Sequence, residues 1–224
     1  MSWSSGKDSA LALHTLRSEG TEVTGLLCTV NSTAGRVAMH AVRRELLEAQ
    51  AAALALPLHV VELPWPCPNE IYEQEMSRAL ERAHAQGVRS VAFGDLFLED
   101  VRAYREQAME GTGLAPVFPL WRRPTGEVSR EILDSGIRAV LTCVDPAKVP
   151  GELAGRWYDE ALLAELGPEV DPCGEHGEFH TFVADGPDFA APIEVAVGER
   201  VCRDGFVFAD LVRTSTTGVE SRRE

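Results

Sequence analysis

Six residues near the start of the chain, Ser4-Ser5-Gly6-Lys7-Asp8-Ser9, combine the residue types that bind phosphate, and a helix-like apolar run over residues 10–16 follows at once. The first N–H groups of a helix have no intrahelical acceptor, and the helix dipole attracts anions to that end. Lys7 adds a positive charge. The segment therefore predicts a phosphate-binding loop, and a helix that Ser or Asp merely caps is the alternative.

The order of these residues differs from the P-loop of kinases and GTPases. That loop places Ser or Thr directly after its lysine to hold magnesium, and it has a glycine five residues before its second glycine. Here Asp8 follows Lys7, and Met1 stands where the first glycine would be. The order Ser-x-Gly-x-Asp-Ser instead resembles the pyrophosphate loop of the N-type ATP pyrophosphatases, which cleave ATP between the α and β phosphates. The resemblance implies that Asp8 caps the helix or helps to place Mg²⁺.

A second cluster of reactive residues lies between positions 171 and 181. The run Asp171-Pro172-Cys173-Gly174-Glu175-His176-Gly177-Glu178-Phe179-His180-Thr181 contains three carboxylates, two imidazoles and a thiol. Carboxylates beside glycines can hold a cation, orient an amine nucleophile or act as a general base. Two alternatives stay open: a metal site made of Cys173, His176, Glu178 and His180, or a turn that only leads into a strand.

Four motifs carry a more specific resemblance: Ser2-Trp3-Ser4-Ser5-Gly6-Lys7-Asp8-Ser9-Ala10, Gly94-Asp95, Pro119-Leu120-Trp121 and Gly174-Glu175-x-Gly177-Glu178-Phe179-x-Thr181. In this order, and over most of the chain, they resemble the diphthine–ammonia ligase family of the adenine nucleotide α-hydrolase superfamily. The resemblance implies an ATP-dependent ligase that adenylates a carboxylate, releases pyrophosphate and lets ammonia or an amine displace AMP. It also implies ATP and Mg²⁺ as cofactors.

The resemblance assigns roles to individual residues. Catalysis falls to Lys7, Asp8, Glu175 and Glu178; the ATP contacts are Ser4, Ser5, Gly6, Lys7, Asp8 and Ser9; and the substrate contacts are Gly174, Glu175, Gly177, Glu178, Phe179, His180 and Thr181. His176 and His180 depart from the family pattern, which usually shows Gly and Glu there. The Ala- and Arg-rich composition suggests a bacterial member, for which diphthine or another carboxylate, on a small molecule or a protein, stays open as substrate.

Strands and helices alternate along the first half of the chain. Strands are expected over residues 23–30, 58–63, 88–93 and 116–120, and helices over 10–16, 42–56, 70–86 and 99–110. This alternation predicts an α/β fold, a Rossmann-like parallel sheet with helices on both faces. Ligands of such sheets bind at the carboxyl ends of the strands, so Asn31 and Asp95 are expected to contact ATP or magnesium.

The region before the loop is unusually short for this fold. Met1-Ser2-Trp3 does not suffice for a buried first strand, so either that strand is very short or the true start lies upstream. We therefore expect the loop to be weakly anchored.

The second half of the chain reads differently. Short helices over residues 127–135 and 157–166 accompany short strands over 139–144, 179–184, 193–197 and 206–211, which predicts a small α+β region. We expect an ATP-binding pyrophosphatase domain over residues 1–120 and a small substrate domain over 121–224, with a disordered tail over 213–224.

Composition limits the partners. The chain has 224 residues and a formal net charge of −14, so nucleic acid is an unfavourable partner. Five cysteines without a CxxC pair, and no apolar run long enough for a membrane span, predict a cytoplasmic protein that forms no disulfides; a homo-oligomer stays open. Alternatives to the ligase are a nucleotide sensor without turnover and a tRNA-modifying ATP pyrophosphatase.

Overall fold

The parallel part of the fold is built from five short strands. The computed structural model describes residues 1–214, and in it β1 (Leu26–Asn31) pairs in parallel with β3 (Leu58–Leu63) and antiparallel with the two-residue β2 (Arg36–Val37). A second pair joins β4 (Ser90–Ala92) to β5 (Ala115–Val117), also in parallel. Parallel neighbours need crossover connections, which helices supply here.

The first three residues join these two pairs of strands. Ser2 N donates to the Ala92 carbonyl at 2.8 Å, and Trp3 N donates to the Leu27 carbonyl at 2.8 Å. The Trp3 side chain is buried, and its Nε1 donates to Gln50 Oε1 at 2.9 Å. Residues 1–3 therefore lie between β1 and β4, which gives the order β3, β1, residues 1–3, β4, β5. The expectation of a weakly anchored loop was wrong, because backbone bonds on both sides and a buried indole hold this segment.

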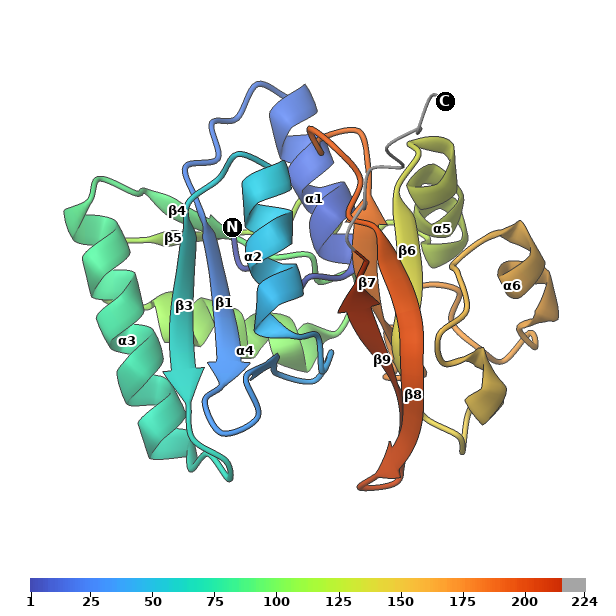
Figure 1. Ribbon diagram of the computed structural model, residues 1–224. Helices are drawn as coiled ribbons and strands as arrows, with labels where there is room; N and C mark the ends of the chain where they lie inside the picture. Colours follow the sequence, from blue (N-terminus) through green and yellow to red (C-terminus); the bar gives the residue numbers. More distant parts are fainter. Residues whose placement is uncertain (215–224) are drawn as a thin grey trace, which may run out of the picture.

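Helices flank this sheet as predicted. They are α1 (Lys7–Ser18), α2 (Arg44–Ala53), α3 (Asn69–Ala85) and α4 (Glu99–Met109). In Figure 1, α1 and α2 lie to the right of β1, α3 lies to the left of β3, and α4 lies behind these two strands. Helix α1 buries an apolar stripe and ends before Gly20, whose φ of +78° is the left-handed conformation that favours glycine after a helix. No helix within residues 1–214 is long and apolar enough to cross a membrane.

The second half of the chain forms an antiparallel sheet, as expected from its short strands. Its order is β7 (Phe179–Asp185), β6 (Arg138–Val144), β9 (Phe206–Arg213) and β8 (Val195–Arg203). Helices α5 (Thr125–Asp134) and α6 (Glu160–Glu165) and a short 3₁₀ turn over Gly151–Leu153 complete this part. Of the tail predicted over 213–224, Arg213 ends β9 and Thr214 N donates to the Glu194 carbonyl at 2.9 Å; residues 215–224 lie outside the described residues.

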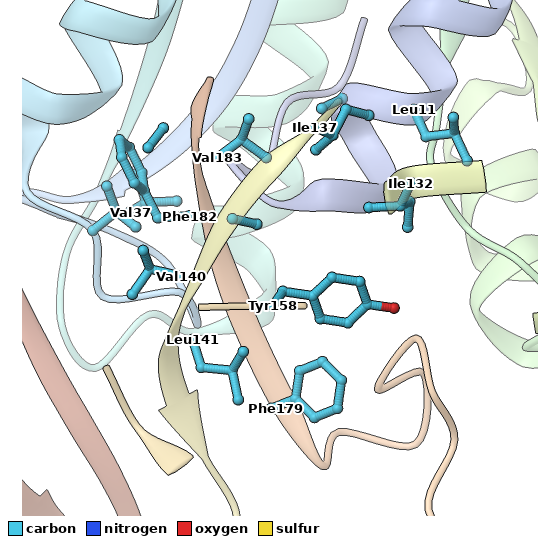
Figure 2. Packing of buried hydrophobic residues seen from close by; sticks show 14 of the residues in the cluster. Leu11, Val37, Ile132, Ile137, Val140, Leu141, Tyr158, Phe179, Phe182 and Val183 are labelled. Carbon is cyan, nitrogen blue, oxygen red and sulfur yellow. The ribbon is translucent and has the colours of Figure 1, made fainter. Parts of the chain in front are cut away.

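One hydrophobic core runs through both halves. Its largest cluster of buried side chains extends from Trp3 to Leu211. Figure 2 shows Leu11 of α1 and Ile132 of α5 packed beside residues of β6 and β7. The loop over residues 4–9 is itself joined to the antiparallel sheet, because the Ser5 carbonyl accepts a hydrogen bond from Val183 N at 2.9 Å. The start of α1 is therefore held by both sheets.

Candidate active site

The loop over residues 4–9 forms a tight, internally bonded turn at the start of α1. The hydroxyls of Ser4 and Ser9 lie 2.9 Å apart, and Gly6 N donates to Ser4 Oγ at 3.2 Å. Ser5 has a φ of +69°, and its side chain is fully buried. The first helical bond runs from Ala10 N to the Gly6 carbonyl at 3.1 Å, so the preceding N–H groups have no intrahelical acceptor. The N-cap residue of α1 is Gly6, and Asp8 lies within the first turn of the helix, so Asp8 is not the capping residue considered from the sequence.

Lys7 points into the protein. Its side chain is 2% exposed, and its ammonium donates to both carboxylate oxygens of Asp8, at 3.0 and 2.9 Å, and to the Cys173 carbonyl. The same ammonium lies 5.4 Å from the ring centroids of Tyr158 and of Phe179, which Figure 2 shows next to each other. Burial is the largest single effect and opposes the charge, but the combined effects of Asp8, Cys173 and Glu175 outweigh it, and the pKa of Lys7 lies above its ordinary value. Lys7 thus links the loop to the second motif.

The second motif packs directly against the loop. Lys7 N donates to Thr181 Oγ1 at 3.1 Å, and Leu96 N donates to Glu175 Oε2 at 3.3 Å. Gly174 has a φ of +73°, and a Cβ there would lie 2.9 Å from the Phe179 carbonyl oxygen, so no other residue fits without strain. The structure therefore brings together the two motifs that the sequence separates by about 170 positions.

A cavity of about 110 Å³ lies between the loop and the motif. Its lining is Lys7, Asp8, His40, Cys173, Gly174, Glu175, Gly177, Phe179, His180 and Thr181. Glu178, which was predicted to be catalytic, does not line it: this carboxylate is buried, and its Oε1 accepts a hydrogen bond from Asp171 N at 3.1 Å. Within residues 1–214, the buried side-chain oxygens that lack a hydrogen-bond partner are Ser5 Oγ and Glu178 Oε2.

Burial changes the acid–base properties of the cavity. Desolvation, with a smaller contribution from the negative charge of Asp8 and against the opposing charge of Lys7, raises the pKa of Glu175 to about 7. Desolvation lowers the pKa of His180 to about 3, and it also lowers the pKa of His40. Near neutral pH the cavity therefore holds a carboxyl group that readily exchanges its proton and two uncharged imidazoles.

The comparison with known proteins agrees with this arrangement of two motifs around one cavity. Residues 1–116 match the family model described as the diphthamide synthase N-terminal domain, and residues 125–216 match the diphthamide synthase C-terminal domain. The chain belongs to the diphthamide synthase family. It is 30% identical over 139 residues to the diphthine–ammonia ligase of Rattus norvegicus, a match that covers 59% of this chain and 51% of the rat protein.

Other diphthine–ammonia ligases give similar matches. The Homo sapiens protein is 31% identical over 129 residues, covering 54% of this chain and 48% of the human protein. The Danio rerio protein is 30% identical over 143 residues, covering 61% of this chain and 54% of the fish protein. The chain thus spans about half the length of the curated relatives it matches.

Asn31 and Asp95, which were expected to contact ATP or magnesium at the strand ends, both have other partners in this member of the diphthamide synthase family. Asn31 ends β1, but its Oδ1 accepts from Thr33 N and Ala34 N at 2.9 and 3.0 Å, which is a turn role, and it does not line the cavity. Asp95 follows β4 and does not line the cavity either, although its negative charge is a minor cause of the raised pKa of Glu175. It accepts a hydrogen bond from Arg105 at 3.4 Å.

The metal site considered for the second motif does not form among the described residues. Cys173 Sγ donates to the Thr125 carbonyl at 3.4 Å, and His176 packs edge-on against Phe97. Within residues 1–214, no group of three or more His, Cys, Asp or Glu side chains is arranged to hold a metal ion.

The sequence analysis missed His40, Gln50 and Tyr158. His40 lines the cavity, Gln50 Nε2 donates to the Ser5 carbonyl at 3.1 Å, and Tyr158 faces the Lys7 ammonium. None of them lies in a motif, and each reaches the loop through a contact between distant parts of the chain. Gln50 offered the one usable signal, because a polar residue on the apolar face of a predicted helix needs a buried partner.

Proposed function

We propose that this chain is an ATP-dependent amide-forming ligase of the diphthine–ammonia ligase type. It adenylates a carboxylate, releases pyrophosphate and transfers the acyl group to ammonia or an amine. Membership of the diphthamide synthase family supports the ligase class, and the names of the relatives support ammonia as the nucleophile. The carboxylate substrate is left open as diphthine or another acid, because the matched relatives are about twice as long as the aligned part of this chain.

The observation that carries the proposal is the shared cavity. An anion-attracting helix start and a carboxyl group with a pKa of about 7 face the same 110 Å³ space. Adenylation needs the first feature, since negative charge develops on the departing pyrophosphate. Amide formation needs the second, since an attacking amine must lose a proton. The two needs are met by different halves of the chain, which we propose act as an ATP-binding domain over residues 1–120 and a substrate domain over 121–224.

In the first step, a substrate carboxylate oxygen attacks the α-phosphorus of ATP. The bond between the α-phosphorus and the bridging oxygen breaks, and pyrophosphate leaves with the electron pair. We propose that the N–H groups of Asp8 and Ser9, which have no intrahelical acceptor, bind the pyrophosphate oxygens in the electrostatic role of an oxyanion hole, whereas Lys7 N already donates to Thr181 Oγ1. Lys7 contributes chiefly by holding the loop against Cys173 and Asp8.

In the second step, the nitrogen of ammonia attacks the acyl carbon of the adenylate. The bond from that carbon to the AMP oxygen breaks, AMP leaves, and the new amide nitrogen loses a proton. Glu175 is the group we propose to accept it. Its pKa of about 7 leaves part of the population ionised at neutral pH while keeping the carboxylate basic enough to act.

The residues of this site fit Mg²⁺ only if the ion binds together with ATP. Mg²⁺ is commonly held by one or two carboxylates together with substrate phosphates. Asp8 lines the cavity and is the one carboxylate within the loop, but both of its oxygens already accept hydrogen bonds from Lys7. We therefore propose that the ATP phosphates hold the ion, with Asp8 beside it, and that the ion neutralises phosphate charge there.

Product analysis tests the proposal. The purified chain is incubated with ATP, Mg²⁺ and pools of candidate carboxylates, each with and without ammonium, and the nucleotide products are separated. Release of AMP and pyrophosphate that depends on both the acid and ammonium is expected. Release of ADP and phosphate, or ATP binding without turnover in every pool, would refute the ligase proposal and favour a nucleotide sensor.

Two variants sharpen this test. Glu175→Gln keeps the hydrogen-bond acceptor for Leu96 N but removes the base, so we expect pyrophosphate release to persist and amide formation to slow by about 10²-fold or more. Glu169→Gln, an exposed carboxylate nearby in the sequence, is the matched control and should retain full activity. Equal loss of both half-reactions in Glu175→Gln would contradict the assigned role.

A further inference from the structure

One wall of the cavity has no role in the proposed chemistry. It is formed by His40 and His180, whose ring centroids lie 4.7 Å apart with the planes tilted by 41°. His180 belongs to the second motif and is a half-buried residue of β7, between the buried Phe179 and Thr181. His40 comes from the loop between β2 and α2, far away in the sequence. Two imidazoles brought together from separate elements beside a cavity form an arrangement that packing alone does not require.

Hydrogen bonding leaves ring nitrogens of this pair free. His40 Nδ1 lies 2.9 Å from the Thr181 carbonyl oxygen. A carbonyl can only accept, so Nδ1 carries a proton and Nε2 is the open nitrogen of the neutral ring. Within residues 1–214, the ring of His180 makes no hydrogen bond. The pair can therefore bind a ligand without losing an existing contact.

The pair lies against the phosphate loop. A Cβ on Gly6 would be only 2.8 Å from His40 Cε1, so the ring packs directly on the residue that precedes α1. Thr181 touches both features: its hydroxyl accepts from Lys7 N at 3.1 Å, and its carbonyl accepts from His40. An anion bound at the first N–H groups of α1 would thus meet the imidazoles at its side.

The loop that carries His40 is fixed by a cluster of charges. Arg36 Nη1 and Arg43 Nε each donate to Asp210 Oδ1 of β9 at 2.9 Å, and Arg43 Nη2 donates to Oδ2 at 2.6 Å. Asp210 therefore holds both ends of the loop. Met39 and Ala41, on either side of His40, have positive φ values of 62° and 53°, a strained conformation that this clamp maintains. His40 is held in place before any ligand arrives.

Other charged groups determine what the pair can bind. Lys7 and Asp8 of α1 face it but neutralise each other, and Glu175 faces the same cavity from the second motif. Cys143, the partner of His180 in the sheet, is kept uncharged by burial, which raises its pKa to about 12. An oxyanion would supply the negative charge that favours a protonated imidazole. Repulsion between rings 4.7 Å apart limits the pair to one proton.

We propose that His40 and His180 form an anion subsite for a phosphate oxygen of the pyrophosphate portion of ATP, and that they take up one shared proton when it binds. The inference rests on the proposed function, since it takes the loop to be the phosphate site. It adds a recognition element and a proton movement that the ligase chemistry does not require. Binding should strengthen as pH falls, because proton uptake accompanies it.

Calorimetric titration with inorganic pyrophosphate tests the subsite. Titrations are run near neutral pH in buffers with different enthalpies of ionisation, so that the dependence of the observed heat on the buffer gives the number of protons taken up. Pyrophosphate itself titrates in this range, so the informative quantity is the difference between wild type and variant. The variants are His40→Gln and His180→Gln, with His59→Gln, an exposed histidine of β3, as the control. Thermal unfolding establishes that each variant is folded.

On binding pyrophosphate, the wild type and His59→Gln should each take up as much as one proton more than His40→Gln or His180→Gln. We also expect either site variant to bind pyrophosphate about tenfold more weakly, as for loss of one charge-assisted hydrogen bond. Glu175 is the other group in the cavity that could take up a proton when pyrophosphate binds, and Glu175→Gln measures its contribution. If that variant abolishes uptake while the histidine variants retain it, or if pyrophosphate binds with no difference among them, the subsite is refuted and the ligase proposal stands. If neither pyrophosphate nor ATP binds the wild-type chain, both are refuted.

Discussion

Replacing Lys7 by Met measures how much the ion pair at the start of α1 stabilises the fold. The Lys7 side chain is 2% exposed and the Asp8 side chain 23%. Removing one partner of a buried pair costs about 3–5 kcal/mol, because the other charge stays buried without compensation. In Lys7→Met the remaining charge is Asp8, which keeps some contact with water, so we expect a loss of about 3 kcal/mol.

The reverse replacement should cost more. In Asp8→Asn the remaining charge is the Lys7 ammonium, which is nearly inaccessible to water and keeps the Cys173 carbonyl and two aromatic rings as partners. We expect a loss near 5 kcal/mol, at the upper end of that range. Because folding raises the pKa of Lys7 above its ordinary value of 10.5, this contribution is fully present at neutral pH. It should be lost only as the pH rises above 10.5 and through the higher pKa of the folded state.

Urea unfolding followed by circular dichroism measures these losses. The double variant Lys7→Met/Asp8→Asn removes both charges, and its loss should be smaller than the sum of the single losses by about 2 kcal/mol or more. Single losses below about 1 kcal/mol, or losses that simply add, would refute the view that Lys7 is committed to this pair. Lys7 would then be free to reach a bound phosphate.

Three further predictions concern other parts of the site. The pKa of Glu175, raised from 4.5 to about 7 chiefly by burial, means that the native state binds more protons in that interval, so stability should fall by up to about 3 kcal/mol as pH rises through it. Urea unfolding across this range should show that Glu175→Gln removes the fall, and an unchanged slope would contradict the assignment. Gly174→Ala should cost about 2–3 kcal/mol by thermal unfolding, because the new Cβ meets a backbone oxygen at 2.9 Å, whereas Gly20→Ala, with the same sign of φ and open space, should cost about 1 kcal/mol; equal costs would argue against the clash. Asp210→Asn should speed hydrogen exchange over residues 36–43 and weaken pyrophosphate binding about tenfold, and intact protection there would show that His40 is held by other contacts.

The regular elements were predictable where a local pattern determines them. Residues 58–63 form β3 as expected, because a mostly apolar run follows Pro57; the preceding helix, expected to reach residue 56, ends earlier, at Ala53. The exposed strand β8 was predicted to end at residue 197 but continues to Arg203, since its outer residues are polar and its length depends on pairing with β9. Two-residue β2 left no pattern in the sequence.

The site was predictable as two motifs and unpredictable as one structure. The types and order of the residues identified the loop and the Gly174–Thr181 segment, but no sequence pattern shows that the Lys7 ammonium reaches the Cys173 carbonyl, 166 positions away. His40 was missed for the same reason: a lone histidine between two strained residues becomes informative only when Asp210 places it beside Gly6. Long-range contacts of this kind depend on tertiary packing.

The hydrogen bond from Val183 N to the Ser5 carbonyl limits how this protein can be recombined. Although the family models divide near residue 120, the loop over residues 4–9 is bonded to Val183, Thr181 and Cys173 from the far side of that division. A chimaera that joins the first half of this chain to the second half of a relative would have to preserve these hydrogen bonds between the two halves. Exchange of substrate specificity within the family is therefore better attempted by changing cavity residues than by swapping halves.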